Sequence, residues 1–174
     1  AAVLRENWFA QRDADDGCTH AAGELFSAKA LPAIDVWRKA RLAIEANRVR
    51  AARDAVAIVA TDVLPQVTQL NDAPTKFLRA HSTAPGRERK ELMVLALIKL
   101  ATSDPDNAAQ MLDAKWSVHF NAEERNWTWG VIGKQAALRL SPTANEYFAK
   151  VSRDTDLNDE LLAWKVRAAL RAGQ

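Results

Sequence analysis

An acidic stretch near the N-terminus has residue types that could coordinate a calcium ion. It contains Asp13, Asp15, Asp16 and Glu24. Calcium loops alternate their oxygen ligands around a sharp turn at a glycine. Here Gly17 comes one position early, and Cys18 occupies the place of the glycine. We therefore interpret the stretch as a solvated acidic loop that caps the next helix.

Cys18 and His20 have the side chains of zinc ligands, but their spacing does not suit a shared metal. Two positions apart on a helix, they point about 200° away from each other, and no second pair of such ligands occurs. We expect neither a metal nor another cofactor. Because Cys18 is the sole cysteine, it is either a buried small residue or half of a disulfide whose partner lies upstream in a longer chain. His81 and His119 stand alone, and we interpret both as structural.

Glu123 and Glu124 are adjacent carboxylates, a residue type that general acid and base catalysis uses. Asn121 with Glu124 three residues later is typical of a capping box at the start of a helix. The dipole of a helix favours acidic residues in its first turn, which explains the pair without chemistry. We assign no catalytic residue.

Basic residues between positions 38 and 53 could bind an anionic polymer. They are Arg38, Lys39, Arg41, Arg48, Arg50 and Arg53. Glu45 is the sole acidic residue among them, so the local excess is five positive charges. The alternative interpretation is a solvated helix face. We take Arg38, Arg41 and Arg48 as candidate residues for binding a glycan or a partner.

The chain has six tryptophans in 174 residues, and sugar rings stack on exposed indoles. Trp37 and Trp129 lie on apolar stripes at helical spacing, which places them in the core. Trp127 shares a face with Val131 and Lys134 instead. It is therefore the fourth candidate binding residue.

The elements that must position these residues are helices. Alanine makes up 34 of the 174 residues, and there are 6 glycines and 6 prolines, a composition that favours helix and argues against disorder or a β-sandwich. The longest apolar run, residues 92–98, is far shorter than the roughly 20 residues that span a bilayer, so we expect no membrane span. A net charge of +2 is too small to imply nucleic acid as a partner.

The helical pattern divides at prolines and polar clusters into about ten helices. Prolines that suit helix starts occur at 32, 74, 105 and 142, at intervals of one helix pair. Residues 92–100 and 127–140 are apolar around most of the helix, as in helices packed on several sides. Gly130 and Gly133 allow close approach of neighbouring helices. We predict an all-α fold, a right-handed α-superhelix or solenoid of stacked short helix pairs, forming one domain over residues 1–174.

The tetratricopeptide repeat is a specific version of this architecture. Trp129, Ile132, Gly133 and Ala136 match the spacing of the first half of its pattern, with two substitutions. In the second half, Asn145 and Ala149 stand where small and aromatic residues belong. We therefore prefer an irregular superhelix that is only similar to such repeats.

Three parts of the chain, in order, resemble the helical region of the large soluble lytic murein transglycosylases. The first runs from Cys18 and Leu25-Phe26 through residues 37–44 to Asn47, and the others are residues 103–109 and 160–173. The resemblance spans most of the chain and is to the U-shaped superhelical domain of that family. It implies a bacterial, periplasmic protein of the cell wall. It also implies a disulfide near Cys18, although no upstream cysteine occurs in these residues.

The catalytic domain of that family is a lyase of peptidoglycan. It cleaves the β-1,4 bond between N-acetylmuramic acid and N-acetylglucosamine and leaves a 1,6-anhydro end. The family's Glu-Ser, Gly-Leu-Met-Gln and Tyr-Asn motifs occur nowhere in this sequence. The resemblance therefore implies a non-catalytic domain, whose partners are glycan strands, the catalytic domain of the same chain and other cell-wall enzymes.

Because the chain begins Ala1-Ala2-Val3 without Met, we expect a processed protein or a fragment of a longer one. Such a domain shapes the enzyme and confines a glycan strand, or binds cell-wall proteins. The alternative hypothesis is an adaptor of the tetratricopeptide kind, which binds a peptide in its concave groove.

Overall fold

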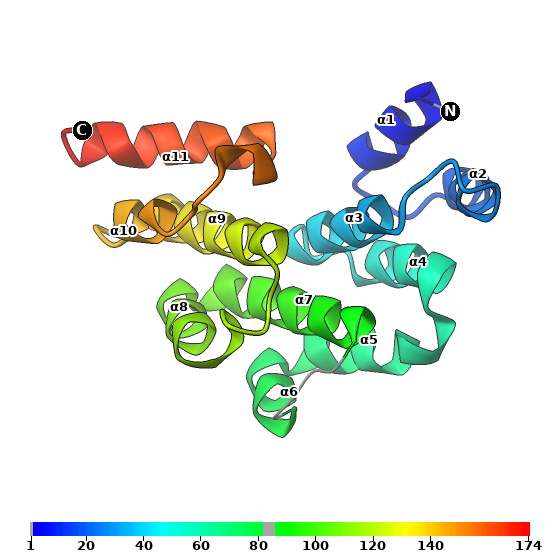
Figure 1. The fold of residues 1–174 in the computed structure, drawn as a ribbon, viewed down its shortest axis with the longest axis horizontal. Coiled ribbons are helices and arrows are strands. Elements are labelled where there is room, and N and C mark those ends of the chain that lie inside the picture. The colour runs from blue at the N-terminus through cyan, green and yellow to red at the C-terminus, as the bar shows by residue number, and fades with distance from the viewer. Residues whose placement is uncertain (1, 82–85) are drawn as a thin grey trace. The chain divides into compact units, whose positions relative to one another are not determined.

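The computed structural model describes residues 2–81 and 86–174, and the regular elements in these ranges are all helical. This confirms the predicted all-α class. The chain divides into two compact units, residues 1–80 and 81–174, and each is described by itself (Figure 1). The predicted single superhelical domain stays a prediction.

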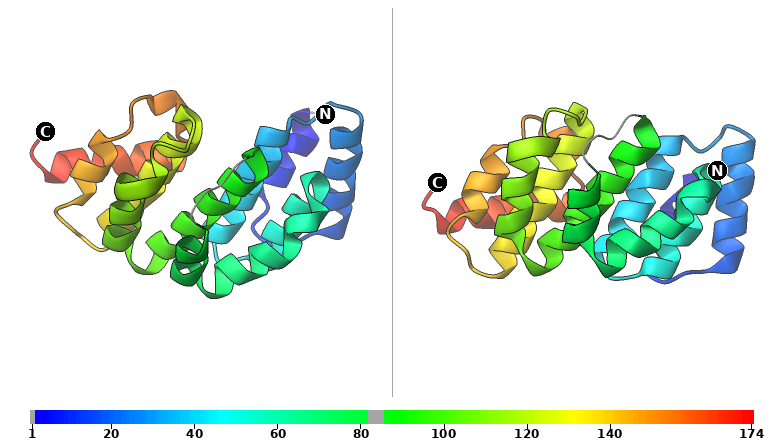
Figure 2. Two further views of the ribbon diagram at one scale, coloured as in Figure 1. Left: turned by 60° about the horizontal axis from the view of Figure 1, so that its bottom comes forward. Right: turned by 90° about the horizontal axis from the view of Figure 1, so that it is seen from below.

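The first unit contains six α-helices and one short 3₁₀ turn in its described residues. They are α1 (Ala2–Ala10), α2 (Asp16–Ser27), α3 (Ala33–Glu45), α4 (Val49–Val59), η1 (Thr61–Val63), α5 (Leu64–Asp72) and α6 (Pro74–Ala80). The chain pairs α3 with α4, then α4 with α5 and α5 with α6, so successive helices from α3 to α6 are neighbours, whereas α2 contacts α4 (Figure 2). The predicted apolar face of α3 is buried, with Val36, Trp37 and Ile44 at its centre.

Charged side chains of α3 hold α1 in place. Lys39 is buried, and its Nζ donates to the carbonyl oxygens of Trp8 and Gln11 at the end of α1. Asp35 is also buried and pairs with the Arg5 guanidinium of α1 at 2.8 Å. A buried charge is tolerated only when such partners replace water. The docking of α1 therefore depends on polar contacts as well as on the burial of Trp8.

The described part of the second unit contains five α-helices and two short helical turns. They are α7 (Arg87–Ser103), α8 (Pro105–Met111), η2 (Leu112–Trp116), α9 (Ala122–Leu138), α10 (Ala144–Ala149), η3 (Asp154–Asp156) and α11 (Asp159–Arg171). Helix α9 contacts α7, α8, α10 and α11. Residues 92–98 of α7 are all buried. Both helices predicted to be packed on several sides are thus confirmed as such.

Two glycines of α9 let its neighbours approach closely. A Cβ atom at Gly130 would lie 2.6 Å from Leu157 Cδ2, and one at Gly133 would lie 2.8 Å from the Phe148 ring. Real Cβ atoms do not tolerate such distances. The predicted role of these two residues is therefore confirmed, and each contact is specified by the absence of a side chain.

Most predicted helix starts are confirmed. Asn121 and Glu124 form the expected capping box, and Asp104 Oδ1 accepts from Asn107 N at 3.1 Å at the start of α8. The helix start predicted at Pro142 is wrong. Helix α10 begins at Ala144, and the Ser141 hydroxyl bonds within the preceding turn because two further residues separate it from the helix.

The buried part of α9 is shorter than the apolar segment predicted at residues 127–140. Leu138 and Leu140 are exposed, whereas the earlier residues of the helix are buried. The helix ends at Leu138, so the helical spacing no longer directs the next apolar residue to the core. Ala1, where the chain begins without Met, lies outside the described residues.

Candidate interaction surfaces

The predicted basic strip is not one exposed surface. Arg41 has 0% of its surface exposed and Lys39 is buried as well, so neither can face a polymer in this structure. Arg38 and Arg48 reach solvent, paired with Asp35 at 3.7 Å and with Asp13 at 2.8 Å. Arg41 was expected to be exposed, and the structure corrects this expectation. Helix α4 packs against one side of α3, and α1 is held against another side by Asp35 and Lys39. Sequence spacing within α3 does not show this cover.

Trp127 is 4% exposed and belongs to the buried part of α9. Its ring cannot stack on a sugar without a rearrangement of the helix neighbours. Trp164, on α11, is the one tryptophan of the six that is only partly buried, and the Arg167 guanidinium lies 4.7 Å from its ring centroid. Among the candidates from sequence, the structure leaves Arg38 and Arg48 accessible and encloses Arg41 and Trp127.

The acidic loop acts as a helix cap, as expected. Asp15 Oδ1 accepts from Cys18 N at 2.8 Å at the start of α2. Asp16 pairs with Arg50 at 3.4 Å. Among the described residues, no group of three or more His, Cys, Asp or Glu side chains is arranged to hold a metal ion.

Glu124 also has the structural role that its position predicted. Its Oε1 accepts from Asn121 N at 3.0 Å, and its own N donates to Asn121 Oδ1 at 2.8 Å. The carboxylate is buried in this cap. Glu124 therefore organises the start of α9.

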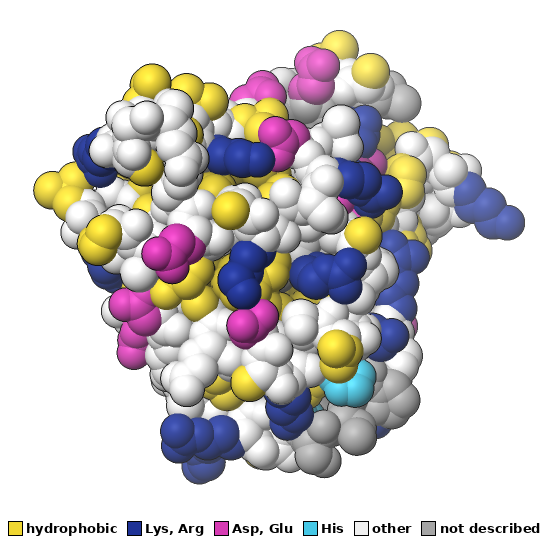
Figure 3. Space-filling view, turned by 60° about the vertical axis from the view of Figure 1, so that its left-hand side comes forward, with side chains coloured by type: hydrophobic (Ala, Val, Ile, Leu, Met, Phe, Trp, Pro, Cys, Tyr) yellow, Lys and Arg dark blue, Asp and Glu magenta, His cyan; other side chains and the backbone are white. Residues whose placement is uncertain are grey.

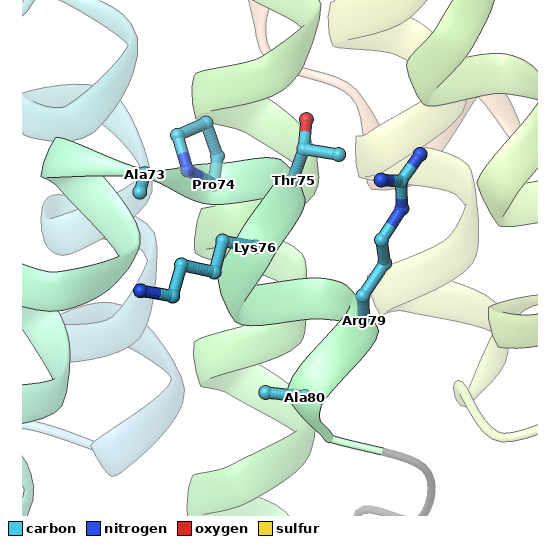
Figure 4. Close-up of a pocket in the computed structure, with 6 residues that line it drawn as sticks. All are labelled: Ala73, Pro74, Thr75, Lys76, Arg79 and Ala80. Carbon is cyan, nitrogen blue, oxygen red and sulfur yellow. The ribbon is translucent and has the colours of Figure 1, made fainter.

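A shallow hollow, open to solvent over most of its extent, lies against α6, and the sequence analysis did not predict it. Its lining consists of Ala73, Pro74, Thr75, Lys76, Arg79 and Ala80. No acidic residue belongs to this lining, and both cations are exposed. Lys76 and Arg79 extend toward opposite sides of the helix, as Figure 4 shows. Cations that diverge in this way suit an extended anionic chain better than one small anion.

The sequence carries a signal for this hollow. Residues 76–90 contain five basic residues and one acidic residue, an excess of four against five between 38 and 53, and Lys76 and Arg79 are the two of these five that line the hollow. The two segments differ in how much neighbouring helices cover them, since Lys76 and Arg79 of α6 are exposed to solvent. A count of charge along the chain ranks the two segments nearly equally, whereas the structure shows that Lys76 and Arg79 are exposed and that Lys39 and Arg41 are buried.

A second hollow, between α4 and α5, has mixed charge. It measures about 270 Å³, and Arg50, Arg53, Asp54 and Asp72 contribute to its lining. Two acids beside two bases leave little net field for an anionic ligand. The hollow against α6 is therefore the better candidate for an anionic polymer.

In the described residues, no helix is long and apolar enough to cross a bilayer. The fold is all-helical, and it is of a kind found in a lytic transglycosylase. The solved structure of an inactive mutant of lytic transglycosylase Slt from Pseudomonas aeruginosa matches with a TM-score of 0.65 and 23% sequence identity. The match covers 99% of this chain and 28% of that chain, so this chain spans less than a third of the solved protein. No family model and no curated protein matches the chain.

Proposed function

We propose that this chain is the non-catalytic helical region, of the U-domain type, of a periplasmic peptidoglycan lytic transglycosylase. The observation that carries the proposal is the fold: nearly the whole chain matches a part of such an enzyme. The three sequence segments that resemble the same family support it independently. The parent enzyme would cleave the bond between N-acetylmuramic acid and N-acetylglucosamine, and this region would shape it and confine a glycan strand.

The positions of the carboxylates support a role without bond cleavage. General acid catalysis requires a carboxyl group placed against the scissile bond. Glu124 is occupied in the cap of α9, and the family's catalytic motifs are absent from residues 1–174. In this proposal the catalytic domain belongs to another part of the parent chain, and that domain is a partner of this one together with other cell-wall enzymes.

Binding to peptidoglycan would use exposed cations. Peptidoglycan strands carry carboxylates along their length, and such groups are attracted to Lys and Arg side chains. Lys76 and Arg79 beside the hollow of α6 are the best placed, and Arg38 and Arg48 are the accessible residues of α3 and of the turn before α4. These contacts lie at exposed side chains, so their strength depends on salt.

The proposal is tested by sedimenting the chain with purified sacculi. We expect retention at an ionic strength of about 0.01 M and release at about 0.15 M, because the Debye length falls from about 30 Å to about 8 Å. The double variant K76S/R79S should be retained about fivefold less at low salt. The matched control is R50S/R53S, which removes the same two charges at the same spacing from α4.

Circular dichroism of both double variants checks that the helices are intact. Equal loss in the two variants would assign retention to net charge and remove α6 from the proposal. If the wild-type chain is not retained at either salt concentration, the glycan-binding function is wrong, and the adaptor alternative gains support.

A further inference from the structure

Four helices in the described ranges end at a residue in the left-handed conformation. These residues are Lys29, Asn47, Leu140 and Gly173, with φ of 56°, 58°, 56° and 75°. At each, two backbone hydrogen bonds close the helix end in the same pattern. Glycine and asparagine suit this conformation, and a polar lysine remains in solvent. Leucine suits neither the conformation nor the solvent.

Leu140 is therefore the exception among these helix ends. Its N donates to Ala137 O at 3.0 Å, and Ser141 N donates to Ala136 O at 3.0 Å. The side chain is 70% exposed, so burial does not offset the strained backbone. A leucine whose backbone conformation costs stability, and whose side chain recovers none of that cost by burial, points to a role outside the fold.

Leu140 lies at the rim of an apolar hollow of about 420 Å³. The hollow is formed by the ends of α9 and α11 and the start of α10. Its floor consists of buried alanines, Ala137, Ala144 and Ala168. Small side chains at the floor leave space for a large apolar side chain from outside, in the manner of a knob and a hole.

The charge around the hollow is positive. Residues 134–145 and 163–174, which contribute its walls, contain five basic residues and no acidic residue, and Glu146 follows directly in the first turn of α10. Two of the five, Lys134 and Lys165, pair with Glu160 and Asp154. Arg171 lines the hollow, and its guanidinium donates to Ala137 O at 3.2 Å, which leaves further N–H groups for a ligand.

Figure 3, which brings the C-terminal end of Figure 1 forward, shows Lys and Arg side chains, and also Asp and Glu side chains, among exposed hydrophobic ones. A second copy of this chain would bring the same arginines together, and like charges oppose that contact. An acidic partner would complement them.

We propose that this hollow binds an acidic segment of a partner protein, which inserts one large apolar side chain above the alanine floor and places a carboxylate on Arg171. Leu140 would then be buried against the inserted side chain, and the contact would offset the cost of its position. This docking site does not depend on the proposed function, because it lies in the second unit and uses none of the residues assigned to glycan.

The test measures binding of labelled peptides of about 12 residues by fluorescence anisotropy. Each peptide carries one central anchor, Ala, Leu or Phe, flanked by Glu, Gln or Lys. We expect affinity to rise from Ala to Leu or Phe, and to fall from Glu to Gln to Lys. The variant L140S should weaken binding of the best peptide about tenfold.

The matched control is L170S, which removes an equally exposed leucine of α11 that does not line the hollow. It should leave affinity unchanged. The variant L140G should raise the Tm by about 3 °C while weakening binding, since glycine relieves the left-handed conformation. A side chain that merely packs in the fold would lower the Tm when removed.

Three results would overturn the proposal. The first is an affinity that does not change with the anchor residue or with the sign of the flanking charge. The others are an equal loss of peptide affinity in L140S and L170S, and self-association that depends on Leu140. Sedimentation velocity of the wild-type chain and of L140S reports the last of these. Such self-association would assign the hollow to a second copy instead.

Discussion

The central helices of the two units, α3 and α9, hold their neighbouring helices by different contacts. In the first unit, α3 buries Asp35, Lys39 and Arg41, and two of these three charges hold α1. In the second, α9 brings its neighbours close at Gly130 and Gly133. Its buried polar residues include Glu124 of the helix cap and Asn126, which exchanges hydrogen bonds with Ser152 and donates one to Asp156.

The two units should therefore be destabilised by different kinds of substitution. A buried charge stabilises only while its partners are in place, so the docking of α1 in the first unit should respond to the loss of a partner. A close contact at glycine depends on volume, so the second unit should respond to a single added methyl group. The following variants test this contrast, beginning with the largest effect.

Gly133→Ala should destabilise the second unit by about 3 kcal/mol, because the new Cβ would lie 2.8 Å from the buried Phe148 ring. Gly23→Ala is the matched control in α2 of the first unit, where nothing lies within 4 Å of the added atom. It should stabilise by about 0.5 to 1 kcal/mol, since alanine is the better helix former. Chemical denaturation measures both, and equal effects would refute the role given to close packing.

Lys39→Met should destabilise the first unit by about 2 kcal/mol, because two carbonyl groups at the end of α1 lose their charged donor. Trp8 should become accessible, which collisional quenching of its fluorescence detects in a chain whose other tryptophans are replaced by phenylalanine. Lys76→Met removes an exposed lysine of the same unit and should change stability by less than about 0.5 kcal/mol. If α1 stays protected in Lys39→Met, burial of Trp8 alone holds it.

The dependence of stability on alkaline pH should have opposite signs in the two units. Burial lowers the pKa of Lys39, and the Cys18 thiolate opposes this shift. The folded state then binds fewer protons than the unfolded state just below pH 10.5, so this residue makes stability rise with pH there.

Tyr147 has the reverse effect. Burial and a hydrogen bond to Asp106 raise its pKa above 10.0, so its contribution is present below that pH and is lost as pH rises through the folded-state value. Denaturation at a series of pH values should show the rise disappear in Lys39→Met and the fall disappear in Tyr147→Phe. Both variants following the wild-type profile would contradict these assignments.

Local sequence patterns predicted much of this fold. The capping box at Asn121, the start of α8 at Pro105 and the close approach at Gly133 each depend on residues within one helix or on size alone. The helix of residues 92–100 was equally clear, because it is apolar on every face. These features need no knowledge of the neighbouring helices.

The binding residues were harder to predict, because exposure depends on what covers each helix. Arg41 and Trp127 have the types that bind polymers or sugars, yet neighbouring helices enclose both. Lys76 and Arg79 have the same types and remain accessible beside a hollow. Leu140 was expected on a buried stripe, and the left-handed turn after α9 exposes it.

The proposed function requires that this chain associates with peptidoglycan and cleaves no bond in it. The most direct measurement incubates the chain with purified sacculi at low ionic strength, then quantifies bound protein in the pellet and 1,6-anhydro muropeptides in the supernatant. The account predicts bound protein with no anhydro product above that of sacculi alone. Release of anhydro muropeptides by the purified chain, or an empty pellet, would contradict it.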